Sequence, residues 1–287
     1  MKALVVYSKA AGKRDFSCHV PLLEKELAGT FETLDFRHSS SEEEASLVYE
    51  DACAKYEVVI VCGGDGTFNN AVNAIMPQPR KPILGYVNFG TIGDVGKNFG
   101  VTRSLSEALA IIRSQHVEKI DIGEIISKGK NRYFAYCAAF GVFSDIAYGV
   151  TRSEKKKVGR LAYYNKAVGE VFEKNQHPYS YESERLKKTS SAPFIMVLNG
   201  RNIGGFIVNR KGKINDGKME IFLTKKGLFN GLLHYLPFST APDDVCSNCR
   251  FSGLEDLPWC LDGEKGPKGD VSFILEPSKI DVFSQKL

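Results

Sequence analysis

Apolar, strand-like runs alternate with helix-like stretches over the first 125 residues of the chain. The strand-like runs are ALVVYS (3–8), FETLDF (31–36), YEVVIVC (56–62) and PILGYV (82–87), and the helix-like stretches include CHVPLLEKELA (18–28), SEEEASLVYEDACAKY (41–56) and SLSEALAIIRS (104–114). This alternation is typical of a parallel sheet covered by helices, because parallel neighbours need a long crossover between them. Residues 1–125 are therefore predicted to form an α/β domain with a doubly wound, mainly parallel sheet.

The pattern changes after about residue 125. The runs become short and rich in aromatic and β-branched residues: RYFAYCAAF (132–140), APFIMVLNG (192–200), KMEIFLT (218–224), DVSFILE (270–276) and KIDVFS (279–284). Gly, Pro, Asn and Asp separate these runs, which predicts antiparallel strands. One helix is expected among them, at GRLAYYNKAVGEVFEK (159–174). We expect residues 126–287 to form a mostly antiparallel β-sandwich, whose last strand can return toward the first domain.

The composition excludes several classes of protein. The chain has 287 residues, 43% of them hydrophobic and 25% charged, which is typical of a globular protein with two domains. Its net charge of +4 is too small to predict a nucleic-acid partner. The 7 cysteines are irregularly placed, as in proteins with reduced thiols, and the single CxxC pair, Cys246 and Cys249, lacks the second half of a zinc motif. No apolar run reaches the roughly 18 residues of a membrane span, so we expect a cytoplasmic protein.

Three of the four predicted parallel strands end in loops that could hold a ligand. The loops are Ser8–Lys13, Gly63–Thr67 and Asn88–Asp94, and ligands of such sheets bind at the carboxyl ends of strands. In the second loop, GGDGT, glycines allow close approach of the backbone, and the helix that begins near Phe68 directs the positive end of its dipole there. A phosphate is the expected ligand. Neither a P-loop nor a G-x-G-x-x-G motif follows a strand in the sequence.

Asp65 stands in the middle of this predicted anion site. A carboxylate repels a phosphate unless a cation bridges the two groups or the carboxylate takes up a proton, and both roles occur in kinases. The alternative is that Asp65 caps its own helix, since Asp is a favoured N-cap residue. Thr67, Gly90, Thr91 and Asp94 on the neighbouring strand ends favour the functional interpretation.

The order of motifs along the chain resembles one protein family. GGDGT is followed by FNNAVNAI (68–75), LGYVNFGTIGD (84–94), DIGEI (121–125), RYFAYCAAFG (132–141), KVGRLAYYNKAV (157–168), NGRNIGGF (199–206), INDGKMEIF (214–222) and LDGE (261–264). These elements resemble the GGDGT-helix, the GTxND motif and the later motifs of the diacylglycerol kinase and sphingosine kinase catalytic domain, a family that includes bacterial diacylglycerol kinase-like lipid kinases. The resemblance covers essentially the whole chain, whereas GGDGT alone is shared with NAD kinases.

The resemblance implies a nucleotide-binding α/β domain, a C-terminal β-sandwich and an active site between them. It also implies ATP as the phosphoryl donor and a lipid hydroxyl as the acceptor. The residues that match the nucleotide site of the family are Ser8, Gly12, Ser39, Gly63, Gly64, Asp65, Gly66, Thr67 and Thr91.

Two motifs of the second half match further sites of the family. Asp216 matches the aspartate of the DG turn, which in bacterial members holds a structural Mg²⁺ with nearby carbonyl groups, here those of Lys213 and Lys218. Asp262 and Glu264 match the DGE motif, whose acids are assigned to deprotonating the acceptor hydroxyl. An ordinary Asp-Gly turn is the alternative in both places.

The sequence also departs from the family pattern. The first turn has Ser8-Lys9 in place of Asn-Pro, the Asn of GTxND is Gly93, a Glu of the helix after GGDGT is Asn70, the Asn near RYFAYCAAFG is Tyr136, and an Asp after that motif is Phe143. These changes fall on nucleotide and acceptor contacts, so they leave the substrate and the level of activity open.

The leading hypothesis is an ATP- and Mg²⁺-dependent lipid kinase, with catalytic Asp65, Asp262 and Glu264 and with diacylglycerol as the default acceptor. A sphingoid base or another glycerolipid remains open as acceptor. An NAD kinase-like enzyme and a non-catalytic nucleotide- or lipid-binding protein are the alternatives. Peripheral membrane contact is expected through Lys155–Lys157 and GLLHYLPF (231–238), although burial in the core explains the apolar run equally well. A homodimer is one of the oligomeric states that the sequence leaves open.

Overall fold

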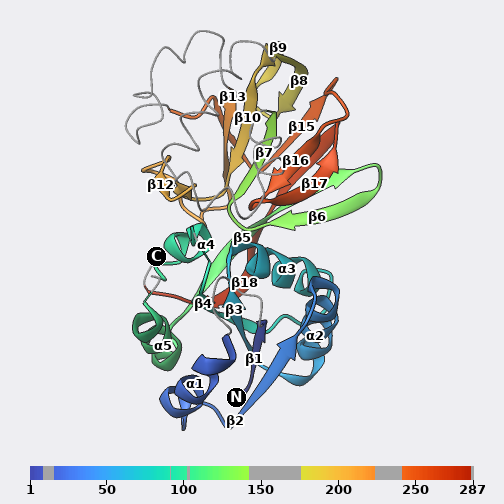
Figure 1. The fold of residues 1–287 in the computed structure, drawn as a ribbon. Helices are drawn as coiled ribbons and strands as arrows, with labels where there is room; N and C mark the ends of the chain where they lie inside the picture. Colours follow the sequence, from blue (N-terminus) through green and yellow to red (C-terminus); the bar gives the residue numbers. More distant parts are fainter. Residues whose placement is uncertain (9–15, 91, 102–103, 142–175, 224–240, 286–287) are drawn as a thin grey trace, which may run out of the picture. The chain divides into compact units, whose positions relative to one another are not determined.

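The computed structural model describes residues 1–8, 16–90, 92–101, 104–141, 176–223 and 241–285 (Figure 1). The chain divides into two compact units. The first unit holds Met1–Ile122, Ile214–Asp216 and Glu276–Leu287, and the second holds Gly123–Lys213 and Gly217–Leu275. The chain thus crosses from one unit to the other between Ile122 and Gly123, again around residues 214–216, and again at Glu276. The strands β5 (Val117–Ser127) and β18 (Val271–Phe283) contribute residues to both units.

The first unit contains a parallel sheet, as the alternating sequence predicts. Its strands are β1 (Lys2–Ser8), β2 (Thr33–Ser39), β3 (Val58–Gly63) and β4 (Ile83–Asn88), in the order β2-β1-β3-β4. Val282 of β18 adds a further parallel pairing, with Leu84 of β4. Every residue of β3 is buried, which is why this central strand reads as an unbroken apolar run rather than an alternating one.

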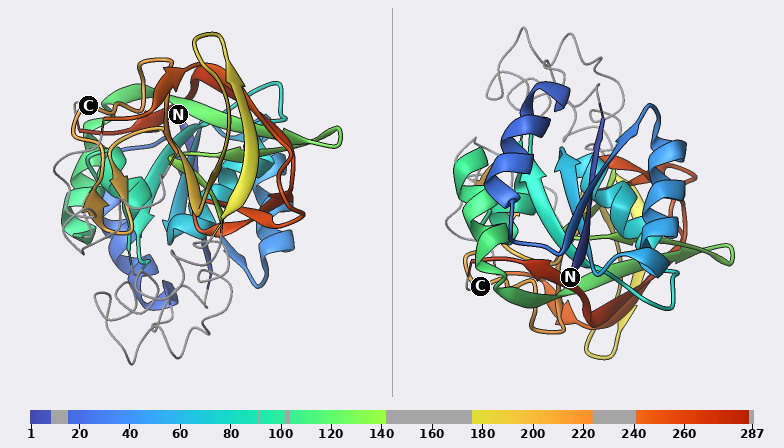
Figure 2. Two further views of the ribbon diagram at one scale, coloured as in Figure 1. Left: turned by 90° about the horizontal axis from the view of Figure 1, so that it is seen from above. Right: turned by 90° about the horizontal axis from the view of Figure 1, so that it is seen from below.

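Helices cover both faces of this sheet. Those of the first unit are η1 (Phe16–His19), α1 (Val20–Leu27), α2 (Glu42–Lys55), α3 (Asp65–Ile75), α4 (Asp94–Asn98) and α5 (Leu105–Ser114). Figure 2 shows α1 and α5 on one face and α2 and α3 on the other. A Cβ atom on Gly85 of β4 would lie 3.1 Å from the Ile60 side chain of β3, which is tighter than usual, and in ordinary contact with Ile112 of α5 at 3.4 Å. The doubly wound α/β architecture is therefore confirmed.

The second unit is built from antiparallel strands in two layers. One sheet has the order β14-β13-β10-β7-β16-β17, formed by β14 (Asp244–Cys246), β13 (Met219–Leu223), β10 (Phe194–Leu198), β7 (Cys137–Gly141), β16 (Pro258–Leu261) and β17 (Glu264–Lys268). The other layer contains β15 (Asn248–Ser252), β8 (His177–Ser183), β9 (Lys187–Ala192), β6 (Lys130–Phe134) and the adjoining parts of β5 and β18. A short pair, β11 (Asn202–Ile203) and β12 (Phe206–Ile207), lies apart from these sheets.

Aromatic side chains form the core between the two layers. Trp259 of β16 is fully buried, and its ring lies 5.0 Å from the ring of Phe273 and 5.6 Å from that of Phe251, both on the opposite layer. Burial of each such side chain stabilises the fold by roughly 1.5–3 kcal/mol. The predicted antiparallel β-sandwich is therefore confirmed.

Two details of the sequence-based strand assignment are wrong. Residues 132–140 were expected to form one strand, but β6 ends at Phe134 and β7 begins at Cys137. Residues 270–276 and 279–284 were expected to form two strands, but β18 is continuous from Val271 to Phe283. The predicted helix at 159–174, the basic cluster Lys155–Lys157 and the apolar run at 231–238 lie outside the described residues. None of the described helices is long and apolar enough to cross a membrane.

Candidate active site

The parallel sheet brings several predicted nucleotide-site residues to one edge of the first unit. Ser8, the last residue of β1, lies opposite Ser39, the last residue of β2, and Ser39 is buried. Gly63 is the last residue of β3, and β3 pairs with the edge of β1 that faces away from β2. Gly12 and Thr91 lie outside the described residues. Among the described residues, the expected grouping at the carboxyl edge of the sheet is therefore present for Ser8, Ser39 and Gly63.

The loops after β3 and β4 touch through their backbones. A Cβ atom on Gly90 would lie 2.7 Å from Cα of Gly64, and a Cβ atom on Gly64 would lie 3.2 Å from Cα of Gly90. The Phe89 N–H also donates to the Gly63 carbonyl at 2.9 Å. These glycines are therefore needed for close approach of two main chains. Neither of them has a positive φ.

Gly63 and Thr67 are packed together as well. A Cβ atom on Gly63 would lie 2.4 Å from Oγ1 of Thr67, so the Thr67 side chain covers the end of β3. The helix α3 begins immediately, with Gly64 as its N-cap residue and without a side-chain cap. The N–H groups of its first turn, including those of Gly66 and Thr67, form an end at which an anion can accept hydrogen bonds.

The Asp65 carboxylate joins the two loops. Its oxygens accept hydrogen bonds from the N–H groups of Gly93, at 2.9 Å, and Val95, at 3.0 Å. These N–H groups begin α4, so Asp65 caps a neighbouring helix, while Gly64 is the N-cap of α3. The alternative that Asp65 caps its own helix is thus wrong. Burial raises the pKa of the Asp65 carboxyl, and the N–H groups of Val95, Asp94 and Gly93 oppose that rise.

Asn70, one of the departures from the family pattern, links α3 to α2. Its Oδ1 accepts from the Ser46 hydroxyl at 2.7 Å, and its Nδ2 donates to the Glu42 carbonyl at 2.9 Å. The Asn70 carboxamide, which can both donate and accept hydrogen bonds, therefore connects α3 to the N-terminal part of α2.

Asp262 and Gly263 form the loop of a tight hairpin between β16 and β17. Leu261 pairs with Glu264 across this loop, and Asp262 and Gly263 have φ values of 50° and 93°. Positive φ at both central positions is the pattern of a type I′ turn, for which Asp-Gly is a preferred sequence. The Asp-Gly turn considered from the sequence is therefore present here.

The Asp262 carboxylate binds the backbone where β6 gives way to β7. It accepts from the N–H groups of Ala135, Tyr136 and Cys137 at 2.6, 3.0 and 3.0 Å. Asn199 binds the carbonyl groups of the same segment. Asn199 Nδ2 donates to the Ala135 carbonyl, and the Asn199 backbone N–H donates to the Tyr136 carbonyl, both at 2.8 Å. This role of Asn199 was not predicted from the sequence. The feature that could have indicated it is the position of Asn199 directly after the buried strand β10.

Glu264 differs from Asp262 in its surroundings. It is the first residue of β17 and is partly exposed, whereas the Asp262 side chain is buried. A partly exposed carboxylate can reach a bound ligand, while a carboxylate bound to consecutive N–H groups is fixed to the protein. Of the two predicted catalytic acids in the second unit, Glu264 is thus the one with a side chain at the surface.

The predicted metal site lies in the turn before β13. Residues 214–217 form bends, Gly217 has φ 73°, and Asp216 is exposed. Because β13 pairs with β10 and β14, the turn does not join the two strands of a hairpin. In the described part of the chain, no group of three His, Cys, Asp or Glu side chains gathers for a metal. One carboxylate with carbonyl groups still fits Mg²⁺, which keeps several of its waters in proteins.

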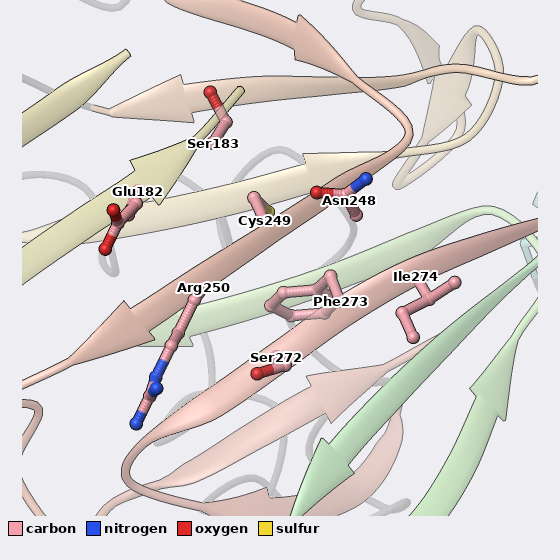
Figure 3. A pocket seen from close by; sticks show the side chains of 8 residues that line it. All are labelled: Glu182, Ser183, Asn248, Cys249, Arg250, Ser272, Phe273 and Ile274. Carbon is pink, nitrogen blue, oxygen red and sulfur yellow. The ribbon is translucent and has the colours of Figure 1, made fainter. Parts of the chain in front are cut away.

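Two surface hollows among the described residues lie away from the residues of the candidate site. A shallow hollow of about 280 Å³ on the β8–β15–β18 layer is lined by side chains that include Glu182, Cys249 and Arg250 (Figure 3). Another, of about 400 Å³, is lined by residues of α1 and α5 that include Leu22 and Arg113. Neither of these hollows is lined by a predicted site residue, so the candidate site rests on the strand-end loops and on the segment around Asp262.

Comparison with known proteins gives the same family that the motifs indicate. Residues 2–125 match the model of the diacylglycerol kinase catalytic domain. A diacylglycerol kinase of Staphylococcus aureus (strain bovine RF122 / ET3-1) is 28% identical over 296 residues, which cover 99% of this chain and 92% of that protein. A diacylglycerol kinase of Staphylococcus haemolyticus (strain JCSC1435) is 27% identical over 297 residues, covering 99% and 88%.

Solved structures share the fold over the full length of the chain. A crystal structure of a diacylglycerol kinase from Bacillus anthracis str. Sterne has a TM-score of 0.84 at 22% identity, covering 99% of this chain and 97% of that one. A second crystal structure from that organism has a TM-score of 0.86 at 23% identity, with the same coverage. The matching catalytic domain at residues 2–125 and the similarity to named diacylglycerol kinases over nearly the whole chain together support a bacterial diacylglycerol kinase-like lipid kinase, a phosphotransferase that acts on an alcohol group.

Proposed function

We propose that this kinase transfers the γ-phosphoryl group of ATP to the free hydroxyl of diacylglycerol, with phosphatidate as the product. The observation that carries the proposal is the joined pair of glycine loops, in which Gly64 touches Gly90 and Asp65 binds the start of α4. Such a pair holds a helix N-terminus open toward a phosphate chain and fixes the neighbouring loop beside it. The relatives named diacylglycerol kinase support the choice of acceptor.

The nucleotide phosphates are assigned to the N-terminal turn of α3. The N–H groups there favour an anion, and three of the residues from Gly63 to Thr67 are glycines, which have no side chain to block its approach. Ser8 and Ser39 stand at the same edge of the sheet. Gly12 and Thr91 remain part of the proposed site from the sequence match. Both oxygens of Asp65 bind backbone N–H groups, so its proposed role is to position the loop rather than to exchange a proton with the substrate.

Glu264 is the proposed base for the acceptor. In the transfer, the lipid hydroxyl oxygen forms a bond to the γ-phosphorus, the bond from that phosphorus to the β,γ-bridging oxygen breaks, and ADP leaves. Glu264 accepts the proton of the hydroxyl, a contribution of the general-base type. Asp262 fixes the segment from Ala135 to Cys137 and is therefore proposed as a positioning residue.

Mg²⁺ supplies charge neutralisation on the phosphates when it is bound. A structural Mg²⁺ is assigned to the Asp216 carboxylate with the carbonyl groups of Lys213 and Lys218, a donor set of oxygen atoms that suits this ion. The exposure of Asp216 leaves room for the waters that Mg²⁺ retains.

The site of action is proposed to be the cytoplasmic surface of a membrane, because the acceptor is a membrane lipid. The basic cluster Lys155–Lys157 is the sequence feature that supports contact with anionic lipids. That the active site includes residues of both units stays a prediction from the sequence. The homodimer also stays a prediction.

The test is transfer of radiolabelled phosphate from ATP to lipids in mixed vesicles. Diacylglycerol, a monoacylglycerol and sphingosine are offered in separate reactions, with NAD as a soluble acceptor. We expect labelled phosphatidate as the main product. Label on sphingosine phosphate would change the acceptor, label on NADP would favour the NAD kinase-like alternative, and ATP binding without transfer to any acceptor would favour the binding-protein alternative.

A further inference from the structure

The Asn88 side chain occupies the space beside Gly93. Asn88 is the last residue of β4 and is buried. Its Oδ1 accepts from the Gly90 N–H at 2.9 Å and from the Tyr86 hydroxyl at 3.4 Å. A Cβ atom built on Gly93 would lie 1.9 Å from Asn88 Nδ2, far closer than two non-bonded heavy atoms can approach. The carboxamide of residue 88 and a side chain at residue 93 therefore exclude each other.

Gly93 is also constrained by its backbone. Its φ is 71°, in the left-handed region, and it is the N-cap of α4. Its N–H donates to Asp65, so the position of residue 93 depends on one contact from α3 and one from β4. Asn is the residue other than Gly that adopts this conformation most readily. Backbone strain alone would therefore allow Asn at residue 93, and the Asn88 carboxamide is what forbids it.

Asn88 acts on the same loop that carries the contact with Gly64. By accepting the Gly90 N–H, its Oδ1 fixes the turn that sets Gly90 against Gly64. By filling the space under Gly93, its Nδ2 supports the start of α4. Hydrogen bonds of an Asn side chain to the backbone two residues on are a known way of ordering turns.

We infer that Asn88 is a positioning residue for nucleotide binding. Asn88 and Gly93 form a coupled pair, because the space beside residue 93 holds only one carboxamide and Asn88 supplies it. The inference rests on the proposed function, since it takes the loop around Gly90 and Gly93 as part of one wall of the ATP site. It explains the departure of this chain from the GTxND motif: the amide expected at residue 93 is replaced by one that enters the same space from β4. It predicts that the two residues can only be exchanged together.

The experiment is a double-mutant cycle with Asn88→Gly, Gly93→Asn and the double variant, measured by ATP affinity in the absence of lipid. Because its side chain would clash with the Asn88 carboxamide, Gly93→Asn should weaken ATP binding by about tenfold or more. Asn88→Gly should weaken it by about three- to tenfold, through loss of the bonds to Gly90 and Tyr86. The double variant should return to within about threefold of the unchanged protein, since it holds one carboxamide in one space.

Kinetic measurements separate positioning from general damage. In the kinase assay, Asn88→Gly should raise the KM for ATP and leave the KM for the lipid unchanged. Gly29→Ala is the matched control, because Gly29 has φ 75° with no atom near a built Cβ. It should lower the melting temperature slightly and leave ATP affinity unchanged. The conservative variant Asn88→Asp keeps an oxygen for the Gly90 N–H and should retain more affinity than Asn88→Gly.

Several results would overturn the inference. Independent, additive losses in the double variant would show that the two residues do not share a space. ATP affinity of Asn88→Gly equal to that of the unchanged protein would remove the positioning role. If the unchanged protein binds ATP and shows the coupling but phosphorylates no lipid, the proposed function fails and the coupled pair stands. If it binds no ATP at all, both fail.

Discussion

Two Asp-Gly pairs, one in each unit, carry carboxylates that bind backbone N–H groups, yet their surroundings differ. Asp65 opens α3 and accepts N–H groups of a neighbouring loop, with its pKa raised by burial. Asp262 lies in a type I′ turn with φ 50° and accepts N–H groups of Ala135, Tyr136 and Cys137. Both residues were expected to be catalytic acids. Their contacts favour positioning roles in both cases, with a stronger structural role for Asp262.

The difference shows how little an acidic motif says about the role of its carboxylate. A carboxylate whose oxygens accept several backbone N–H groups stabilises a main-chain conformation. Glu264, two residues from Asp262, is partly exposed, so its side chain lies where a bound ligand can meet it. Mutations at these positions can therefore separate stability from turnover.

The largest effect is expected at Asp262. Asp262→Ala leaves the N–H groups of residues 135–137 without their acceptor, and each unsatisfied buried group costs about 1–3 kcal/mol. It also places Ala at positive φ, so a total loss of about 4 kcal/mol or more in the free energy of unfolding is expected. Urea denaturation measures this loss. A yield of soluble protein near zero would agree with it, because total stabilities are only about 5–15 kcal/mol.

Two further variants calibrate this result. Asp262→Asn keeps one acceptor oxygen and a residue that tolerates positive φ, so it should lose about half as much stability as the alanine variant. Asp256→Ala removes an exposed ion pair with Lys268 and should change stability by less than about 1 kcal/mol. Equal stabilities of Asp262→Ala and Asp256→Ala would show that the hydrogen bonds from residues 135–137 to Asp262 do not stabilise the fold.

The next largest effect is expected at Glu264, on turnover instead of stability. Glu264→Gln keeps the shape of the side chain and removes the base, so kcat should fall by about 10²- to 10⁴-fold. The melting temperature should stay within about 2 °C, since a substitution that keeps the shape of a partly exposed side chain should change stability by under about 0.5 kcal/mol. Lys265→Gln is the neighbouring control, because successive side chains of a strand point to opposite faces. Unchanged kcat in Glu264→Gln would sink the proposed base.

The fold was largely predictable because its signals are local. Parallel strands that are buried on both faces read as continuous apolar runs, as in Val58–Cys62, and helices of ordinary length separate them. The two errors in strand assignment have remote causes. Ser278 donates its N–H to the Asp121 carboxylate, which supports the backbone of β18 across the Pro-Ser pair. Asp262 draws the N–H groups of Ala135 and Tyr136 out of a strand ladder.

The candidate site was predictable in its members but not in its contacts. Glycine loops after apolar strands point to an anion site because of where parallel strands end. The sequence cannot show that Asp65 turns toward Val95, or that Asn88 fills the space beside Gly93, since each contact depends on how two loops meet. From the sequence, Gly93 was interpreted as a departure from the family motif. In the structure, the absence of a side chain at residue 93 makes room for the Asn88 carboxamide.

A smaller effect is expected at Asp65, which sharpens the contrast with Asp262. Asp65→Ala removes the acceptor of the Gly93 and Val95 N–H groups, but it also relieves the burial of a charge. A net loss of about 1–2 kcal/mol in the free energy of unfolding is expected, together with an increase of roughly tenfold in the KM for ATP. Urea denaturation and initial-rate kinetics measure the two. A stability loss as large as that of Asp262→Ala would remove the distinction between the two carboxylates.

The smallest effect is the pH dependence of stability at Asp65, because burial and N–H bonds oppose each other there. Its pKa is raised, so the folded chain holds a proton that the unfolded chain has already lost, and the contribution of Asp65 to stability falls as the pH rises from about 4 toward that raised pKa. Bonds from the Ser40 side chain and backbone lower the pKa of Glu44, so its contribution should instead be lost as the pH falls. The unfolding free energies of Asp65→Asn and of Glu44→Gln are each subtracted from that of the unchanged protein at the same pH, between about pH 3 and 6. The two differences should therefore change with pH in opposite directions. Slopes of the same sign would show that burial does not dominate at Asp65.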